Sequence, residues 1–157
     1  MEHFSVNIVH FTHGSVFVSG GDVYIGGSSL WKNGQAQTTG ITGNRTITSV
    51  FVTGNDVYAV ARHSSVSWRS GDTIDITVNV NGAWISKNGN AERLDISSNP
   101  NLILAGANSV YAVGNDVYVA GDVDGIATLW RNGEQYMIGD QTAKESGAFS
   151  VFVRPKQ

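Results

Sequence analysis

Apolar and polar residues alternate over short stretches of this chain, and Gly or Asn separates one stretch from the next. Around Gly114-Asn115, for example, Val110 and Ala112 precede the turn at alternate positions, and Val117 and Val119 follow it in the same way. Alternation with a period of two is typical of half-buried β-strands. Because Gly and Asn tolerate the positive φ that tight hairpin turns require, the pattern predicts a β-hairpin.

This hairpin is one copy of a phrase that the chain repeats. Full copies read SVFVSGGDVYIGG at 15–27, SVFVTGNDVYAVA at 49–61 and SVYAVGNDVYVAG at 109–121, and SVFV opens a fourth at 150–153. Asp22, Asp56 and Asp116 follow the first turn of each copy, where a short side chain accepts hydrogen bonds from turn amides. A repeat of this size sets the architecture of a chain.

A second phrase follows each full copy and ends in Asn-Gly, as SLWKNG, AWISKNG and TLWRNG. Asn-Gly is a further hairpin signal, and it leads to predicted fourth strands at 35–41, 90–96 and 134–138. Four short antiparallel strands per repeat predict an all-β protein of the β-propeller type, with three four-stranded blades.

We expect a single domain over residues 1–157. Its predicted parts are an N-terminal strand within 4–14 (Phe4–Phe11), blades at 15–48, 49–108 and 109–149, and a closing strand at 150–153. Propeller rings use about four to eight blades, so three blades do not close one. The sequence therefore predicts a homo-oligomer, with a homodimer giving a ring of about six or seven blades. An open three-blade stack and a fragment of a longer protein are the alternatives.

The pattern SVFVxGNDVYVAG…LWKNG resembles a propeller-like repeat of uncharacterised bacterial proteins, many of them secreted or surface-attached and from gut bacteria. The resemblance covers nearly the whole chain, from Ser15 to Val153. It implies a secreted or cell-surface location, although no signal peptide is visible in the sequence. A looser similarity is to small oligomeric propeller lectins, in which chains of few blades assemble into rings and bind sugars between blades. No lectin motif matches residue by residue, so this similarity implies no site residue.

The second repeat carries an insertion at 62–81, within which 72–80 alternates like a strand. The insertion either lengthens the middle strands of the blade or adds a hairpin. Function is often carried by the element that interrupts a repetitive scaffold. The candidate ligand-binding residues are Trp68, which offers a flat apolar face and an N–H donor, Arg69, which suits an acidic group, and the carboxylates Asp72 and Asp75. The alternative is that the two carboxylates only face solvent and bind no ligand.

Three further Trp residues, Trp31, Trp84 and Trp130, are assigned to one position of the second phrase. A Trp that recurs with the repeat is expected to pack one blade on the next rather than to bind a ligand. Loops that lead from an outer strand to the next inner strand are expected to take part in binding, and they lie at 42–48, 97–108 and 139–149.

Composition narrows the classes of partner. The net charge is −3 and the 10 Lys and Arg residues are scattered, which argues against a nucleic-acid surface. No apolar run approaches the length of a membrane span. The chain has no Cys, so it has neither a disulfide nor a thiolate metal site.

Motifs for metal binding and catalysis are weak, and we expect no cofactor. Asp122 and Asp124 resemble the start of a calcium loop, but no Glu follows at the required spacing. The favoured interpretation is therefore a polar turn, and a metal site is the alternative. His10 and His13 lack a third ligand. No Ser lies in a G-x-S-x-G elbow, and the chain is predicted not to be an enzyme.

The sequence thus predicts a non-catalytic binding or scaffold module that recognises a protein or a glycan through its propeller loops and the insertion at 62–81. Two alternatives stay open. One is a structural subunit of a cell-surface or phage assembly, and the other is a small carbohydrate-active enzyme whose carboxylate pair comes from Asp72, Asp75, Glu92 and Asp95.

Overall fold

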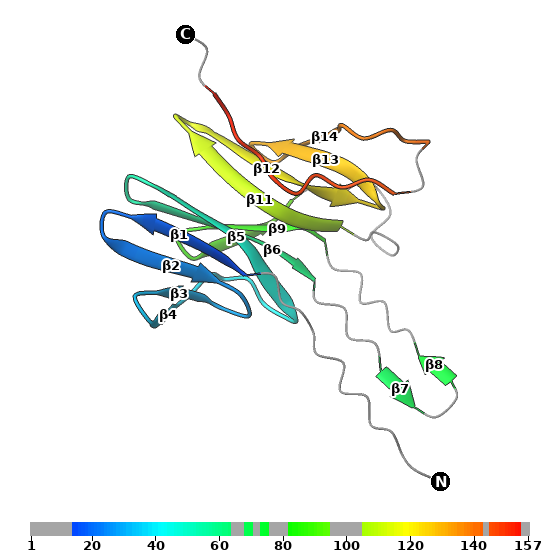
Figure 1. The fold of residues 1–157 in the computed structure, drawn as a ribbon, viewed down its shortest axis with the longest axis horizontal. Helices are drawn as coiled ribbons and strands as arrows, with labels where there is room; N and C mark the ends of the chain where they lie inside the picture. Colours follow the sequence, from blue (N-terminus) through cyan, green and yellow to red (C-terminus); the bar gives the residue numbers. More distant parts are fainter. Residues whose placement is uncertain are drawn as a thin grey trace.

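The computed structural model describes residues 14–63, 68–70, 73–75, 82–94, 105–142 and 145–154. These residues form β-strands, turns and connecting segments, with no helix among them, so the all-β prediction is confirmed (Figure 1). The strand expected at Phe4–Phe11 lies outside the described residues.

The first repeat forms a four-stranded antiparallel sheet, here called the first module. Its strands follow one another in chain order and are β1 (Ser15–Ser19), β2 (Asp22–Gly26), β3 (Leu30–Lys32) and β4 (Gln35–Gln37). Val16 pairs with Ile25 and Val18 pairs with Val23, so these four side chains share one face of the sheet. The opposite face carries Phe17 and its partner Tyr24, as the alternation predicts.

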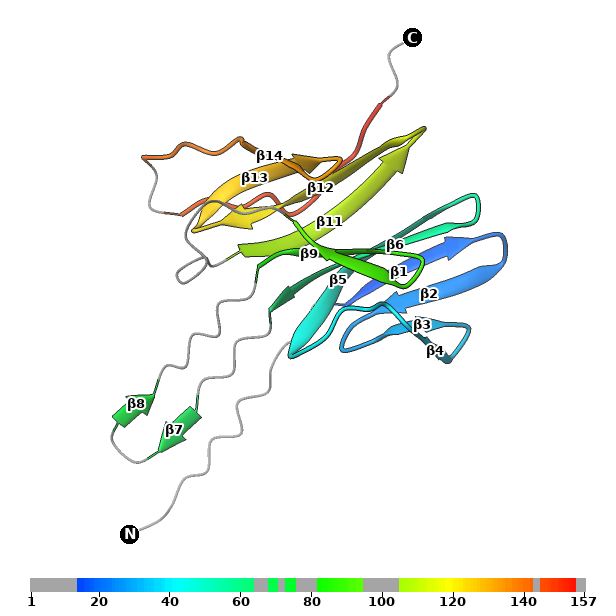
Figure 2. The same cartoon turned by 180° about the vertical axis from the view of Figure 1, so that it is seen from behind.

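The second and third repeats form modules of the same strand order. The second module consists of β5 (Arg45–Thr53), β6 (Asp56–His63), β9 (Trp84–Lys87) and β10 (Asn90–Arg93). The third module consists of β11 (Ala105–Val113), β12 (Asp116–Val123), β13 (Ile126–Arg131) and β14 (Glu134–Met137). A bridge between Gly106 and Arg62 joins the two modules into one curled eight-stranded sheet. The second module lies between the other two (Figures 1 and 2).

The hairpin turns have the geometry that their residues favour. Asn33, Asn88 and Asn132 have φ values of 49°, 51° and 52°, and the Gly that follows each of them is also at positive φ, as a type I′ turn requires. In the first hairpin of the second module only Gly54 has positive φ, at 57°, which is the pattern of a type II′ turn. Gly54 therefore supplies the positive φ that this turn requires, and Asn55 does not have a positive φ.

The inner strands of the second and third modules begin earlier than the repeated phrase does. β5 starts at Arg45 and β11 at Ala105, and in each strand the register shifts just before the Ser that opens the phrase. The shift is a β-bulge that leaves one extra residue, Thr48 in β5. Its hydroxyl donates to the carbonyl oxygen of Ala107 at 2.6 Å, so the bulge links the second module to the third.

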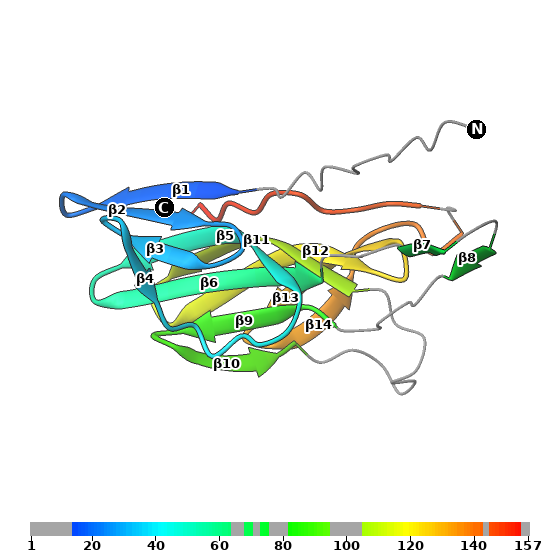
Figure 3. The same cartoon turned by 90° about the horizontal axis from the view of Figure 1, so that it is seen from below.

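The modules stack face to face, with one apolar cluster at each boundary. Between the first and second modules the buried cluster is Tyr24, Leu30, Ile47, Val50, Val52, Ala59 and Ala61. Between the second and third it is Tyr58, Val60, Ala83, Ile85, Leu94, Ala107, Val110, Ala112, Val119, Val123 and Trp130. Figure 3 shows the first sheet lying along β5 and β6. Burial of these clusters is the main force that holds the modules together.

The aromatic residue of the repeated phrase runs through the stack as a ladder. Ring centroids are 5.1 Å apart for Phe17 and Phe51, 4.7 Å for Phe51 and Tyr111, and 5.2 Å for Tyr111 and Phe152. Tilted and edge-on contacts at these distances are favourable for aromatic pairs. The same repeat position therefore occupies the same place in each layer.

The C-terminal segment 145–154 continues this stacking, but residues 150–153, which were predicted as a closing strand, do not form a β-strand. The amide of Val151 donates to Ser109 Oγ at 3.2 Å, just as the amide of Val110 donates to Ser49 Oγ at 3.3 Å. The segment thus lies on the third module as β11 lies on the second. The fourth SVFV has the position of an inner strand.

The insertion of the second repeat adds a hairpin, one of the two outcomes expected. β7 (Trp68–Ser70) pairs with β8 (Thr73–Asp75) in a separate two-stranded sheet. The rest of the predicted strand at 72–80 lies outside the described residues.

Candidate functional site

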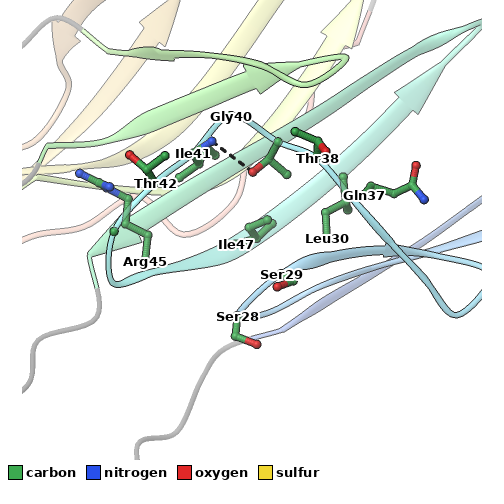
Figure 4. Close-up of a pocket in the computed structure, with 12 residues that line it drawn as sticks. Ser28, Ser29, Leu30, Gln37, Thr38, Gly40, Ile41, Thr42, Arg45 and Ile47 are labelled. Atoms are coloured by element: carbon green, nitrogen blue, oxygen red, sulfur yellow. Dashed lines mark hydrogen bonds between the residues drawn. The ribbon is translucent and has the colours of Figure 1, made fainter.

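A pocket of about 330 Å³ lies between the first and second modules (Figure 4). It is lined by Ser28, Ser29, Leu30, Gln37, Thr38, Thr39, Gly40, Ile41, Thr42, Gly43, Arg45 and Ile47. Leu30 and Ile47 also belong to the apolar cluster of this boundary, so they give the pocket apolar walls. Five hydroxyl side chains, the side-chain amide of Gln37 and one guanidinium supply its polar groups.

The crossover from β4 to β5, residues 38–44, shapes the pocket by packing on the outer hairpin of the second module. Ser86 Oγ donates to the carbonyl oxygen of Thr39 at 2.6 Å, and the Thr39 hydroxyl accepts from the amide of Ile41 at 3.2 Å. A Cβ on Gly40, whose φ is 70°, would lie 2.6 Å from the carbonyl oxygen of Gly89. Gly40 therefore permits the crossover to lie directly against this hairpin.

Arg45 provides the charge of the pocket. Its guanidinium lies over the Trp84 ring, with Cζ 4.6 Å from the centroid, which is a cation–π contact. Burial, and to a smaller extent the nearby Arg93, lower the pKa of Arg45 from its ordinary value. Within the described residues no carboxylate pairs with this guanidinium.

Arg45 and the Trp84 ring that its guanidinium covers each have one buried N–H donor without an acceptor. Arg45 Nε and Trp84 Nε1 are both shielded from solvent and have no hydrogen-bond partner. A buried donor without a partner is costly, since it has lost its bond to water. The pocket wall therefore has a cation that pairs with no carboxylate among the described residues, and hydroxyl side chains line the same pocket.

A different polar cluster recurs in all three modules and supports the hairpins. In the first module Asp22 accepts from Lys32 Nζ and from Asn33 Nδ2, each at 2.7 Å, while the amide of Val23 donates to Asn33 Oδ1 at 2.9 Å. The equivalent clusters are Asp56–Lys87–Asn88 and Asp116–Arg131–Asn132. The hydrogen bond from Lys32, followed by that from Asn33, lowers the pKa of Asp22. Each Asp thus accepts from the Lys or Arg that ends the third strand of its module and from the Asn of the Asn-Gly turn. The prediction that it accepts from turn amides is wrong.

A third polar cluster lies at the boundary of the second and third modules. Arg62 donates to Asn108 Oδ1 at 3.1 Å, and its Nη2 lies 3.8 Å from Asp122 Oδ1. Burial raises the pKa of Asp122, while Arg62 and Asn108 lower it. Asp122 therefore forms an ion pair with Arg62. Asp124 lies at φ 50° in the turn between β12 and β13, and the described residues hold no group of three metal-ligating side chains.

Three of the four predicted ligand-binding residues lie on the inserted hairpin. Trp68 and Arg69 belong to β7 and Asp75 to β8, and the register pairs Trp68 with Asp75 across the hairpin. Asp72 lies outside the described residues. The sequence had not singled out the pocket, although the predicted binding loop at 42–48 supplies part of its lining.

One sequence assignment was wrong. Trp31 pairs with Ile25 and Trp130 with Val119, but the residue that pairs with the equivalent Ala59 is Ser86. Trp84 pairs with Ala61 instead, one alternation earlier along β9. The small side chain at Ser86 leaves room for the crossover, and the displaced Trp84 supports Arg45.

No family model matches the chain, and comparisons with curated proteins and with solved structures find no match either. Among the described residues there is no helix of the length and apolarity that a membrane span needs.

Proposed function

We propose that this chain is a non-catalytic binding module of the propeller type, which takes an acidic carbohydrate in the pocket between its first two modules. The observation that carries this proposal is Arg45, a partly buried cation on the pocket wall that pairs with no carboxylate among the described residues. The carboxylate of an acidic sugar supplies the opposite charge, because a guanidinium binds a carboxylate through paired hydrogen bonds.

The rest of the lining suits a sugar ring. Carbohydrates present hydroxyl edges and apolar C–H faces, so they need short polar side chains next to apolar ones. Ser28, Ser29 and Thr42 offer hydroxyl donors and acceptors, and Leu30 and Ile47 offer an apolar surface (Figure 4).

We also propose that the three modules are propeller blades. Each is a four-stranded antiparallel sheet in chain order, and the inner strands β1 and β5, like β5 and β11, lie in contact. Binding residues are often carried by loops on a rigid scaffold, and ligand pockets often lie where structural units meet. The pocket is at such a boundary, and its crossover is such a loop.

The inserted hairpin stays a second candidate surface, in which Trp68 and Arg69 contact a glycan or a protein. The two surfaces differ in which substitution removes binding. This makes a single experiment able to choose between them.

The experiment is an array of neutral and carboxylate-bearing oligosaccharides, followed by titration of the best binder. Arg45→Gln is the test variant, and Arg131→Gln is its control, because Arg131 is an exposed guanidinium paired with Asp116 in the third module. We expect Arg45→Gln to weaken the affinity for acidic glycans by about 10- to 100-fold, the loss typical of a charge-assisted bond, and Arg131→Gln to leave it unchanged. Far-UV circular dichroism verifies that both variants fold.

Trp68→Ala is the variant for the second surface. If it removes binding while Arg45→Gln does not, the ligand contacts the inserted hairpin and the pocket proposal is wrong. The pocket proposal also fails if acidic glycans do not bind at all.

A further inference from the structure

The first module exposes an apolar sheet face. Val16, Val18, Val23, Ile25 and Trp31 lie together on it, because the register pairs Val16 with Ile25, Val18 with Val23, and Ile25 with Trp31. Val16 is 67% exposed and Val18 is 63% exposed. We call these five residues the head face. Adjacent large apolar side chains on one exposed surface are typical of an interaction site.

The equivalent face is buried in the other two modules. Val50 and Val110 occupy the position of Val16, and each is only 4% exposed. Trp130 occupies the position of Trp31 and is 0% exposed. In both cases the face is covered by the preceding module of the chain. The head face is therefore built for contact with another sheet of this same kind.

The sheet that covers such a face brings the aromatic residue of the repeated phrase to the boundary. Phe17 does so for the second module and Phe51 for the third, where each ring contacts the next aromatic of the ladder. Phe152 is the fourth aromatic of the ladder. Its ring contacts Tyr111 on one side, and it is 73% exposed. Phe152 thus exposes an aromatic ring of the kind that packs on the equivalent faces of the second and third modules.

We propose that the head face of one copy binds the Phe152 end of a second copy, so that copies associate head to tail. The contact repeats between chains the stacking that joins the modules within a chain. Because the two surfaces differ, the interface is heterologous, and it gives a closed ring if the rotation per copy closes or a filament if it does not. This assembly goes beyond the binding function proposed above and does not depend on it.

The test uses one variant for each surface. Val18→Lys places a charge on the head face, and Phe152→Asp places one at the opposite end; both residues are exposed, so both variants are expected to fold. Met137→Lys is the control, because Met137 is an exposed apolar residue of β14 that belongs to neither surface. Sedimentation velocity over a wide range of concentration gives the size of each species, and circular dichroism verifies the fold.

We expect the native chain and Met137→Lys to assemble and each of the other two variants to be monomeric. An equimolar mixture of Val18→Lys and Phe152→Asp then forms a dimer and nothing larger, because the first variant retains its tail and the second its head. A native chain that is monomeric at every concentration overturns the proposal. So does assembly that Val18→Lys does not affect. If Phe152→Asp assembles like the native chain while Val18→Lys does not, the head faces pair with each other and the head-to-tail contact is wrong.

Discussion

Trp130 and Trp31 occupy one repeat position in two different environments, so replacing each by Ala measures what module stacking contributes. Trp130 is fully buried at the boundary of the second and third modules, where a Cβ on Gly121 would lie 3.0 Å from its Cζ3. Large-to-small substitution of a buried Trp costs about 3–5 kcal/mol, because it removes apolar contacts and leaves a cavity. For a chain of this size that corresponds to a melting temperature lower by roughly 6–20 °C.

Trp31 is 41% exposed on the open face of the first module, so its removal is expected to cost only about 1 kcal/mol in the monomer. Urea unfolding followed by far-UV circular dichroism at low protein concentration measures both free energies of unfolding. It avoids Trp fluorescence, which the substitutions themselves change. Equal losses for the two variants in monomeric protein would refute the assignment of Trp31 to an open face. Losses below about 1 kcal/mol for Trp130→Ala would refute the packing of the second module on the third.

Three further predictions follow from single contacts. Hydrogen bonds from Asn132 and Arg131 lower the pKa of Asp116, so the unfolded chain binds more protons than the folded chain as the pH falls below about 5. The stability that Asp116 contributes is present above its unfolded pKa of about 3.9 and is lost as the pH falls through its folded pKa. The free energy of unfolding is therefore expected to depend less on pH in Asp116→Asn, as measured by urea unfolding between neutral and acidic pH. Gly121→Ala is expected to cost about 3 kcal/mol in thermal unfolding, because its Cβ would overlap the carbonyl oxygen of Gly106 and the ladder between β11 and β12 would have to separate. Asn88→Gly keeps the positive φ of its turn but removes the side-chain bonds to the first two residues of β6, so it is expected to cost about 1 kcal/mol in urea unfolding, and no loss would show that the cluster is not stabilising.

Much of the local structure could be predicted because it depends on residues close together in the sequence. The face shared by Val110, Ala112, Val117 and Val119 is as predicted, since the turn at Gly114-Asn115 and the strand alternation set that register. The Asn-Gly turns likewise have the predicted geometry. A hairpin needs only its own turn and two strands to define which side chains lie together.

The candidate site was not predictable in this way. Arg45 has no motif around it, and its contact with Trp84 depends on how β5 and β9 are placed within the second module. The alignment of Trp84 with Trp31 by residue type also led to an error. The Asn-Gly turn fixes the register of β9 on β6, and in this register Ser86, not Trp84, occupies the position equivalent to Trp31. Turns and backbone pairing decide the register of a strand, so the same residue type in two similar sequence motifs does not guarantee the same position.

The amino-acid sequence by itself determined that this is an all-β chain of repeated hairpins, since alternation and turn residues act between near neighbours. The tertiary structure alone decided which of three similar sheet faces is open, where the pocket lies, and which cation lines it. Those features arise where modules meet, through pairs such as Ser49 and Val110 or Phe51 and Tyr111, which lie far apart along the chain. Burial at such contacts is a property of the stacked sheets, and no single repeat contains it.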